Sequence, residues 1–244
     1  MKGWDLKEGE IRIKNIVEIE IFEYFKDFFK KSTTMKNIYK LILLKSLITI
    51  SDIKKDNKFP IIVIEFGNFF KEFTIQNMSV SSTMYNGNSK YSSQELLILN
   101  LKNNQTLQSR EKYIKETKKN IKLNVLGALY GDFEGTIYSF NKKEETLILN
   151  PQFQDFMFKN SEILLELIDY RMIEFLKLVN PLENLKELSL LKKYNCNVEE
   201  DFYKKIESKF KVFSKNIESN GEKTLLELAE ENNELIKEIL ENFN

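Results

Sequence analysis

The chain has 244 residues, with 37 basic and 37 acidic side chains, one cysteine and no histidine. Without histidine, it holds no Ser-His-Asp or Cys-His nucleophile system, no histidine-ligated metal and no histidine-based nuclease centre. A net charge of zero provides no overall field toward nucleic acid or an anionic membrane, so any such contact requires a local patch.

Hydrophobic periodicity predicts helices in the first part of the chain. Residues 11–31 carry apolar side chains at spacings of three and four, with a strand as the local alternative near residues 17–22. The hydroxyls of residues 32–34 are suited to start a second helix. That helix, from about residue 35 to 53, is apolar around most of its circumference, so we expect it to be buried at the centre of the protein.

A third helix and a loop follow. Pro60 suits a first helical position, and the phenylalanines of residues 61–76 keep helical spacing. Residues 77–93 contain an Asn-Gly-Asn turn and many serines, and this composition predicts a loop. Helices are expected again over residues 94–102 and 108–129.

The periodicity then changes to that of strands. Residues 136–140 and 146–149 alternate as two short strands joined by a turn, and Asn150-Pro151 ends the second strand. Since two strands are marginal alone, the hairpin should pack against helices. Helical spacing returns from residue 152 to 179.

The chain becomes more highly charged after Pro181, with helices predicted through residues 182–193, 198–217 and 225–243. We therefore predict a mainly α fold: a multi-helix domain with one small β-hairpin near residues 136–149 and a helical C-terminal extension. The core module is expected at residues 1–181. The extension, residues 182–244, is expected to pack on the core or on a partner. The proposed partner-binding residues of its apolar stripe are Leu228, Leu235 and Ile239.

Catalytic patterns are weak. The glycines form neither a Walker nor a dinucleotide-binding pattern. Acid-x-Lys triplets occur, as at residues 116–118, but not on a convincing buried strand, so a magnesium-dependent nuclease without histidine is only a minor alternative. Asp132 and Glu134 fit a solvated turn better than a cation site, and Cys196 lacks a histidine base. We expect no catalytic residue, no metal and no cofactor.

Lysines on two helices are the candidate nucleic-acid contacts. In the segment 112–122 they recur at spacings of three and four, which places them on one helix face where they could contact successive phosphates. A solvated face is the alternative, because glutamates interrupt the run and lysine is abundant throughout the chain. The complete proposed set is Lys36, Lys40, Lys45, Lys112, Lys115, Lys119 and Lys122.

Two segments together resemble a known family. The aromatic and Ser/Thr stretch at residues 28–34, followed by Tyr39-Lys40 and a hydrophobic helix, resembles a region near the start of bacterial HNH endonuclease-domain proteins. The second match runs from Leu129-Tyr130 through the hairpin to Asn180-Pro181 and is similar to the region preceding their nuclease domain. Beyond it this chain has lysine- and glutamate-rich helices without histidine, so the resemblance implies only the non-catalytic helical module, used for target engagement or assembly.

The expected function is thus that of a non-enzymatic, cytoplasmic module in bacterial restriction or antiviral defence, with nucleic acid or a separate nuclease or effector as its partner. The alternative is an adaptor, inhibitor or immunity-type protein that binds another protein without touching nucleic acid. The amino terminus alternates charges, and the longest apolar runs fall far short of the roughly 18–20 residues needed to span a bilayer, so no membrane contact is expected.

Overall fold

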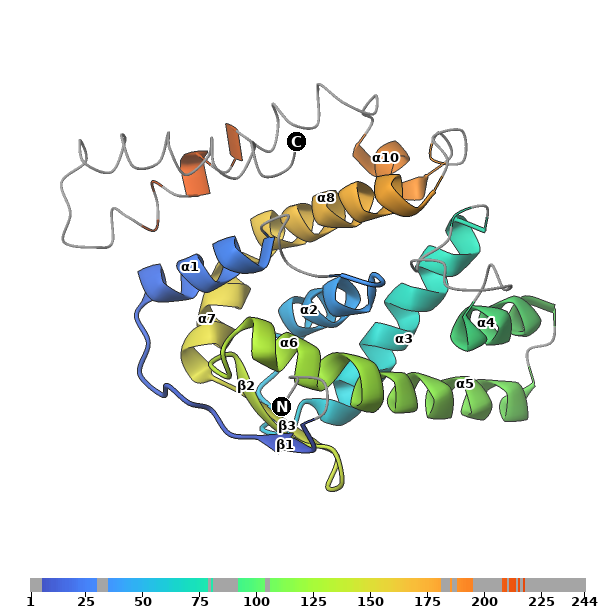
Figure 1. Cartoon of the computed structure of the whole chain (residues 1–244), viewed down its shortest axis with the longest axis horizontal. Coiled ribbons are helices and arrows are strands. Elements are labelled where there is room, and N and C mark those ends of the chain that lie inside the picture. Colours follow the sequence, from blue (N-terminus) through green and yellow to red (C-terminus); the bar gives the residue numbers. More distant parts are fainter. Residues whose placement is uncertain are drawn as a thin grey trace.

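The computed structural model is mainly helical, with one small antiparallel sheet, as the sequence predicts (Figure 1). It describes residues 6–29, 35–78, 80, 92–103, 106–180, 185, 188–194, 208, 209, 211–213, 215 and 217. The helices are α1 (Glu18–Phe29), α2 (Tyr39–Thr49), α3 (Phe59–Gln76), α4 (Ser93–Asn103), α5 (Leu107–Asn120), α6 (Leu126–Asp132), α7 (Pro151–Lys159), α8 (Ser161–Val179) and α10 (Ser189–Tyr194). The strands are β1 (Glu8–Gly9), β2 (Tyr138–Asn141) and β3 (Thr146–Leu149).

Helix α2 lies at the centre of the protein, with α3, α6, α7 and α8 packed around it (Figure 1). Every α2 side chain is buried except Lys40, Lys45 and Thr49. Ser46 is buried, and its hydroxyl donates to the carbonyl of Ile42 at 2.7 Å, so this polar group has a hydrogen-bond partner inside the protein. The predicted buried central helix is confirmed. It begins where the Asn37 side chain accepts from the Tyr39 amide; the predicted capping residues 32–34 lie outside the described residues.

The amino-terminal prediction was wrong in part. Helix α1 begins only at Glu18, and the segment before it runs along the sheet, where β1 pairs with β2 as a third strand that the sequence did not reveal. Tertiary contacts override the helical periodicity here. Tyr130 donates to the Glu10 carbonyl at 2.6 Å, and a Cβ on Gly9 would lie 2.7 Å from the Tyr130 ring. The alternative prediction, a strand at residues 17–22, is also wrong from Glu18 onward, since those residues are helical.

The predicted hairpin is present as β2 and β3, paired antiparallel from Tyr138–Leu149 to Asn141–Thr146. Tyr138 is fully buried and its hydroxyl donates to the Leu126 carbonyl at 2.8 Å, which attaches the hairpin to α6. Helices α3, α7 and α8 match their predictions closely, and Pro60 and Pro151 stand in the first turns of α3 and α7.

The chain beyond α8 is described only in places. Leu185 and Leu188 are buried, and the ring of Phe213 packs against those of Phe22 and Phe156 at 5.5 and 6.1 Å. Lys209 bonds Glu166 on α8 at 2.6 Å. These residues of the predicted extension therefore contact α1, α7 and α8. The proposed partner-binding residues Leu228, Leu235 and Ile239 lie outside the described residues.

Asn150 joins three parts of the fold. It is fully buried; its amide donates to the carbonyls of Ile13 and Thr136 at 2.9 and 3.0 Å, and its Oδ1 accepts from the Gln152 amide at the start of α7. The amino-terminal segment, the hairpin and α7 thus meet at one side chain.

We expect Asn150→Ala to lower the free energy of unfolding by about 3 kcal/mol, because two buried carbonyls lose their donor and α7 loses its cap. Urea denaturation followed by circular dichroism measures this. Asn124→Ala, which removes only an exposed contact to Asn120, serves as the control and should change stability by less than about 0.5 kcal/mol. Equal effects of the two variants would contradict the role given to Asn150.

Candidate functional site

The orientation of α5 is fixed by polar contacts on its inner side. The Tyr113 hydroxyl donates to the Gly67 carbonyl of α3 at 2.6 Å, and Gln94 of α4 donates to Thr117 at 2.9 Å. Both Tyr113 and Thr117 are buried, and Thr106 caps the helix by accepting from the Ser109 amide. These contacts leave the opposite side of α5 facing outward.

That outward side carries the lysines predicted to share a face. The five lysines Lys112, Lys115, Lys118, Lys119 and Lys122 line one hollow of about 580 Å³ together with Glu116 and Leu123. Lys112, Lys115 and Lys119 are exposed, and the Lys119 side chain is 62% accessible despite an ion pair with Glu116 at 3.7 Å. Within the described part of the chain, Lys112 and Lys115 form no ion pair. We call these five residues the α5 lysine face.

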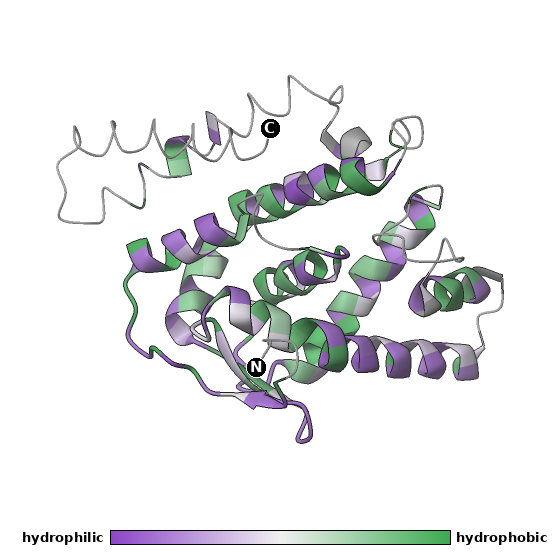
Figure 2. Ribbon diagram, in the orientation of Figure 1, coloured by the Kyte–Doolittle hydropathy of each residue, from purple (hydrophilic) through white to green (hydrophobic). Residues whose placement is uncertain are grey.

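The turn between β2 and β3 is attached to this face. Glu145 accepts from Lys118 at 2.8 Å and from Lys122 at 3.2 Å, while its carbonyl accepts from Asn57. The hydrogen bond from Lys118, with that from Lys122, holds the pKa of the Glu145 carboxyl below its ordinary value. Glu145 also has a left-handed backbone, φ 55°, a conformation that costs a non-glycine residue energy and that these bonds stabilise. Figure 2 shows the turn and the outer side of α5 as hydrophilic regions.

A π-helical turn, Ile121–Val125, interrupts the predicted helix of residues 108–129 directly after α5. Ile121 and Val125 are fully buried, whereas Lys122 and Leu123 of the same turn lie on the lysine face. Such wider turns inside helices occur often at functional sites. Sequence periodicity does not reveal it, because the apolar spacing continues through the turn.

The other predicted lysines, Lys36, Lys40 and Lys45, do not belong to the α5 lysine face. Lys40 Nζ lies 2.7 Å from Asp132 of α6, with only 12% of its side chain accessible. Burial raises the pKa of the Asp132 carboxyl, and Lys40 opposes that rise. Lys45 pairs with Asp169 of α8, and Lys36 is exposed ahead of α2. The lysine face thus comprises the predicted residues of α5 and the π-helical turn, while Lys40 and Lys45 are engaged with carboxylates of other helices.

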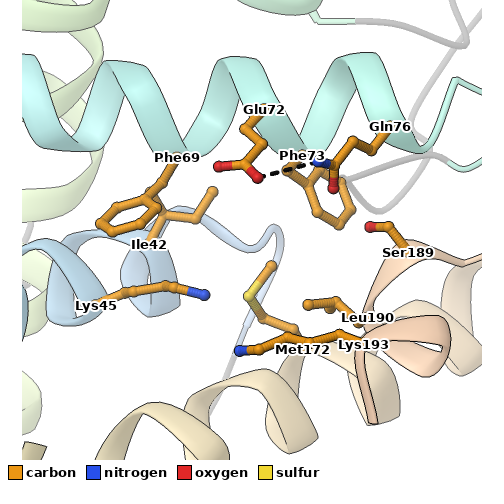
Figure 3. Close-up of a pocket in the computed structure, with 10 residues that line it drawn as sticks. All are labelled: Ile42, Lys45, Phe69, Glu72, Phe73, Gln76, Met172, Ser189, Leu190 and Lys193. Atoms are coloured by element: carbon orange, nitrogen blue, oxygen red, sulfur yellow. Dashed lines mark hydrogen bonds between the residues drawn. The ribbon is translucent and has the colours of Figure 1, made fainter. Parts of the chain in front are cut away.

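A cavity lies between α2, α3, α8 and α10. It measures about 570 Å³, and Figure 3 shows the residues lining it: Ile42, Lys45, Phe69, Glu72, Phe73, Gln76, Met172, Ser189, Leu190 and Lys193. No periodic pattern in the sequence predicts this cavity. The one local signal near it is Asp169, an acid within the apolar run of α8.

Asp169 is fully buried beside this cavity and accepts from Lys45 at 2.7 Å and Lys193 at 2.6 Å. Burial alone would raise the pKa of its carboxyl, but the two ammonium groups outweigh burial and hold the pKa below its ordinary value. One carboxylate thus joins α2, α8 and α10.

In the described ranges, no group of three or more cysteine, aspartate or glutamate side chains is arranged to hold a metal ion. Likewise, none of the helices described is both long enough and apolar enough to cross a bilayer.

Comparison with known proteins gives no relative: no family model, no curated protein and no solved structure matches this chain. The resemblance to the region preceding the HNH nuclease domain therefore stays a prediction from the sequence.

The shared carboxylate predicts a pH dependence. A carboxyl whose folded-state pKa is depressed stabilises the fold fully above its unfolded pKa, about 3.9, and loses that contribution as the pH falls through the folded value. We expect Asp169→Asn to lower the free energy of unfolding near neutral pH by about 3 kcal/mol, because Lys45, with 17% of its side chain accessible, loses its carboxylate.

On acidification below about pH 4, the stability of Asp169→Asn should fall less steeply than that of the unaltered protein. Urea unfolding at a series of pH values measures both effects. Glu144→Gln, at an exposed position of the β2–β3 turn, is the control and should follow the unaltered protein. Parallel acid curves for Asp169→Asn and the unaltered protein would show that this carboxyl makes no such contribution.

Proposed function

We propose that this chain is a non-enzymatic module that contacts the phosphate backbone of a nucleic acid through the α5 lysine face. The observation that carries the proposal is the exposure of Lys112, Lys115 and Lys119 on one side of a helix whose other side is fixed by α3 and α4. A rigid helix holds the ammonium groups at set intervals, so less conformational freedom is lost on binding than with lysines on a loop.

The spacing of the lysines supports a phosphate ligand. From Lys112 to Lys122 the helix advances roughly 15 Å at 1.5 Å per residue. A nucleic-acid strand of that length carries about four phosphates, since one strand of duplex has a charge every 3.4 Å. Lys118 and Lys122 are partly neutralised by Glu145, so Lys112, Lys115 and Lys119 are expected to contribute most.

Phosphate contacts of this kind position a protein on nucleic acid without reading its sequence. We therefore propose binding with little base preference, in a protein that works with a separate nuclease or effector in bacterial restriction or antiviral defence. The defence context rests on the resemblance of residues 25–190 to the region preceding the HNH nuclease domain, and the identity of the adjacent genes would test it.

The binding experiment uses fluorescence anisotropy with short labelled duplex and single-stranded DNA and RNA, at about 50 and 200 mM salt. We expect affinity for at least one of these to fall steeply with salt. In the triple variant Lys112→Gln, Lys115→Gln, Lys119→Gln, the slope of log affinity against log salt should decrease by about 2–3, since roughly 0.7–0.9 is lost per phosphate contact.

A matched triple variant, Lys54→Gln, Lys71→Gln, Lys159→Gln, removes the same charge from exposed positions off the face and should keep the original slope. Equal loss in both triple variants would show a general charge effect and overturn the proposed site. Absence of salt-sensitive binding to all four nucleic acids would overturn the function.

A further inference from the structure

The cavity is spanned by α10, which is tied across it at both ends. At one end, Asn77, which follows α3, donates to the Ser189 hydroxyl at 2.9 Å and accepts from the Ser189 amide at 2.8 Å. At the other end, Lys193 bonds Asp169 of α8. These two links hold α10 in place over a space that its side chains do not fill. The volume of about 570 Å³ lies within the roughly 300–1,000 Å³ of small-molecule sites.

The cavity lining is largely apolar. Ile42 comes from α2, Phe69 and Phe73 from α3, Met172 from α8 and Leu190 from α10. A hydrophobic side chain of a ligand would thus contact apolar groups of four helices. Met172 is unbranched and polarisable, so it can adjust to differently shaped apolar groups.

The charged groups are arranged on two sides of this apolar space. Lys45 and Lys193 stand on one side and Glu72 on the other, as Figure 3 shows. Asp169 is fully buried and bonds both lysines, but it does not itself line the cavity. Lys45 has three N–H donors and Asp169 needs one of them. Glu72 is exposed and accepts from Gln76 Nε2 at 3.0 Å, which orients its carboxylate.

We propose that this cavity binds a hydrophobic α-amino acid as its zwitterion. The ligand carboxylate faces Lys45 and Lys193, the ligand ammonium faces Glu72, and the side chain lies among Phe69, Met172 and Leu190. A fatty acid would match the charge of the lysines but not that of Glu72, and an apolar amine would match Glu72 but not the lysines, whereas a zwitterion carries both charges. This proposal does not depend on binding of nucleic acid.

The first test compares three related probes by isothermal titration calorimetry with the full chain. L-phenylalanine carries both charges, 3-phenylpropionate lacks the ammonium and 2-phenylethylamine lacks the carboxylate. We expect phenylalanine to bind and each analogue to bind about tenfold more weakly or worse, the loss of one charge-assisted hydrogen bond. L-leucine and L-methionine should bind as well. Failure of all three amino acids to bind, or equal affinity of either analogue and phenylalanine, would overturn the proposal.

The second test assigns the charges to residues. Glu72→Gln should weaken phenylalanine about tenfold and leave 3-phenylpropionate no weaker than before, because only the ammonium contact is lost. Since Glu72 is exposed, the variant should remain folded, and thermal unfolding checks this. Lys71→Gln, the exposed neighbour outside the cavity, is the control and should bind phenylalanine normally. Unchanged phenylalanine affinity in Glu72→Gln, or an equal loss in Lys71→Gln, would place the ligand elsewhere.

Discussion

The architecture depends on one constraint: α2 has no polar face. Its Leu41, Leu43, Leu44 and Leu47 point in different directions and are all fully buried, so neighbouring helices must enclose it from every side. Helices α3, α6, α7 and α8 serve this purpose and direct their own apolar sides inward. The two candidate sites lie around this centre: the lysine face on the outer side of α5, and the cavity beside α2 that is also lined by α3, α8 and α10.

Sequence reasoning found the elements whose signal is local. Pro60 at the start of α3, Asn150-Pro151 at the end of the hairpin and the all-round hydrophobicity of α2 are each signals within a short window. The third strand could not be found this way. Its stabilising contacts join Gly9 and Glu10 to Tyr130, far along the chain, while Ile13 and Val17, whose spacing suggested a helix, are 43% and 60% exposed. Tertiary contacts determine the conformation of this amino-terminal segment, and the periodicity of a sequence carries no information about such contacts.

The same difference between local signals and contacts made far along the chain applies to the two candidate sites. The α5 lysine face was predictable, since residues three and four apart on a helix share a side. Whether a lysine is available for a ligand was not, because its carboxylate can lie far away in sequence: Asp132 is 92 residues from Lys40, and Asp169 is 124 residues from Lys45. The cavity escaped prediction for a related reason. It requires four helices to be brought together without filling the space between them.

The shared carboxylate of Asp169 has a consequence for how α10 can move. Two ammonium groups hold one acid, so if α10 swings away with Lys193, the acid still keeps Lys45 and no buried charge is stranded. The remaining Asp169–Lys45 pair is electrically balanced. Displacing α10 would therefore break the Lys193 contact and the Asn77–Ser189 hydrogen bonds and would expose the buried Leu190, but it would leave no uncompensated buried ion. The second lysine therefore makes the charge balance around Asp169 independent of the position of α10.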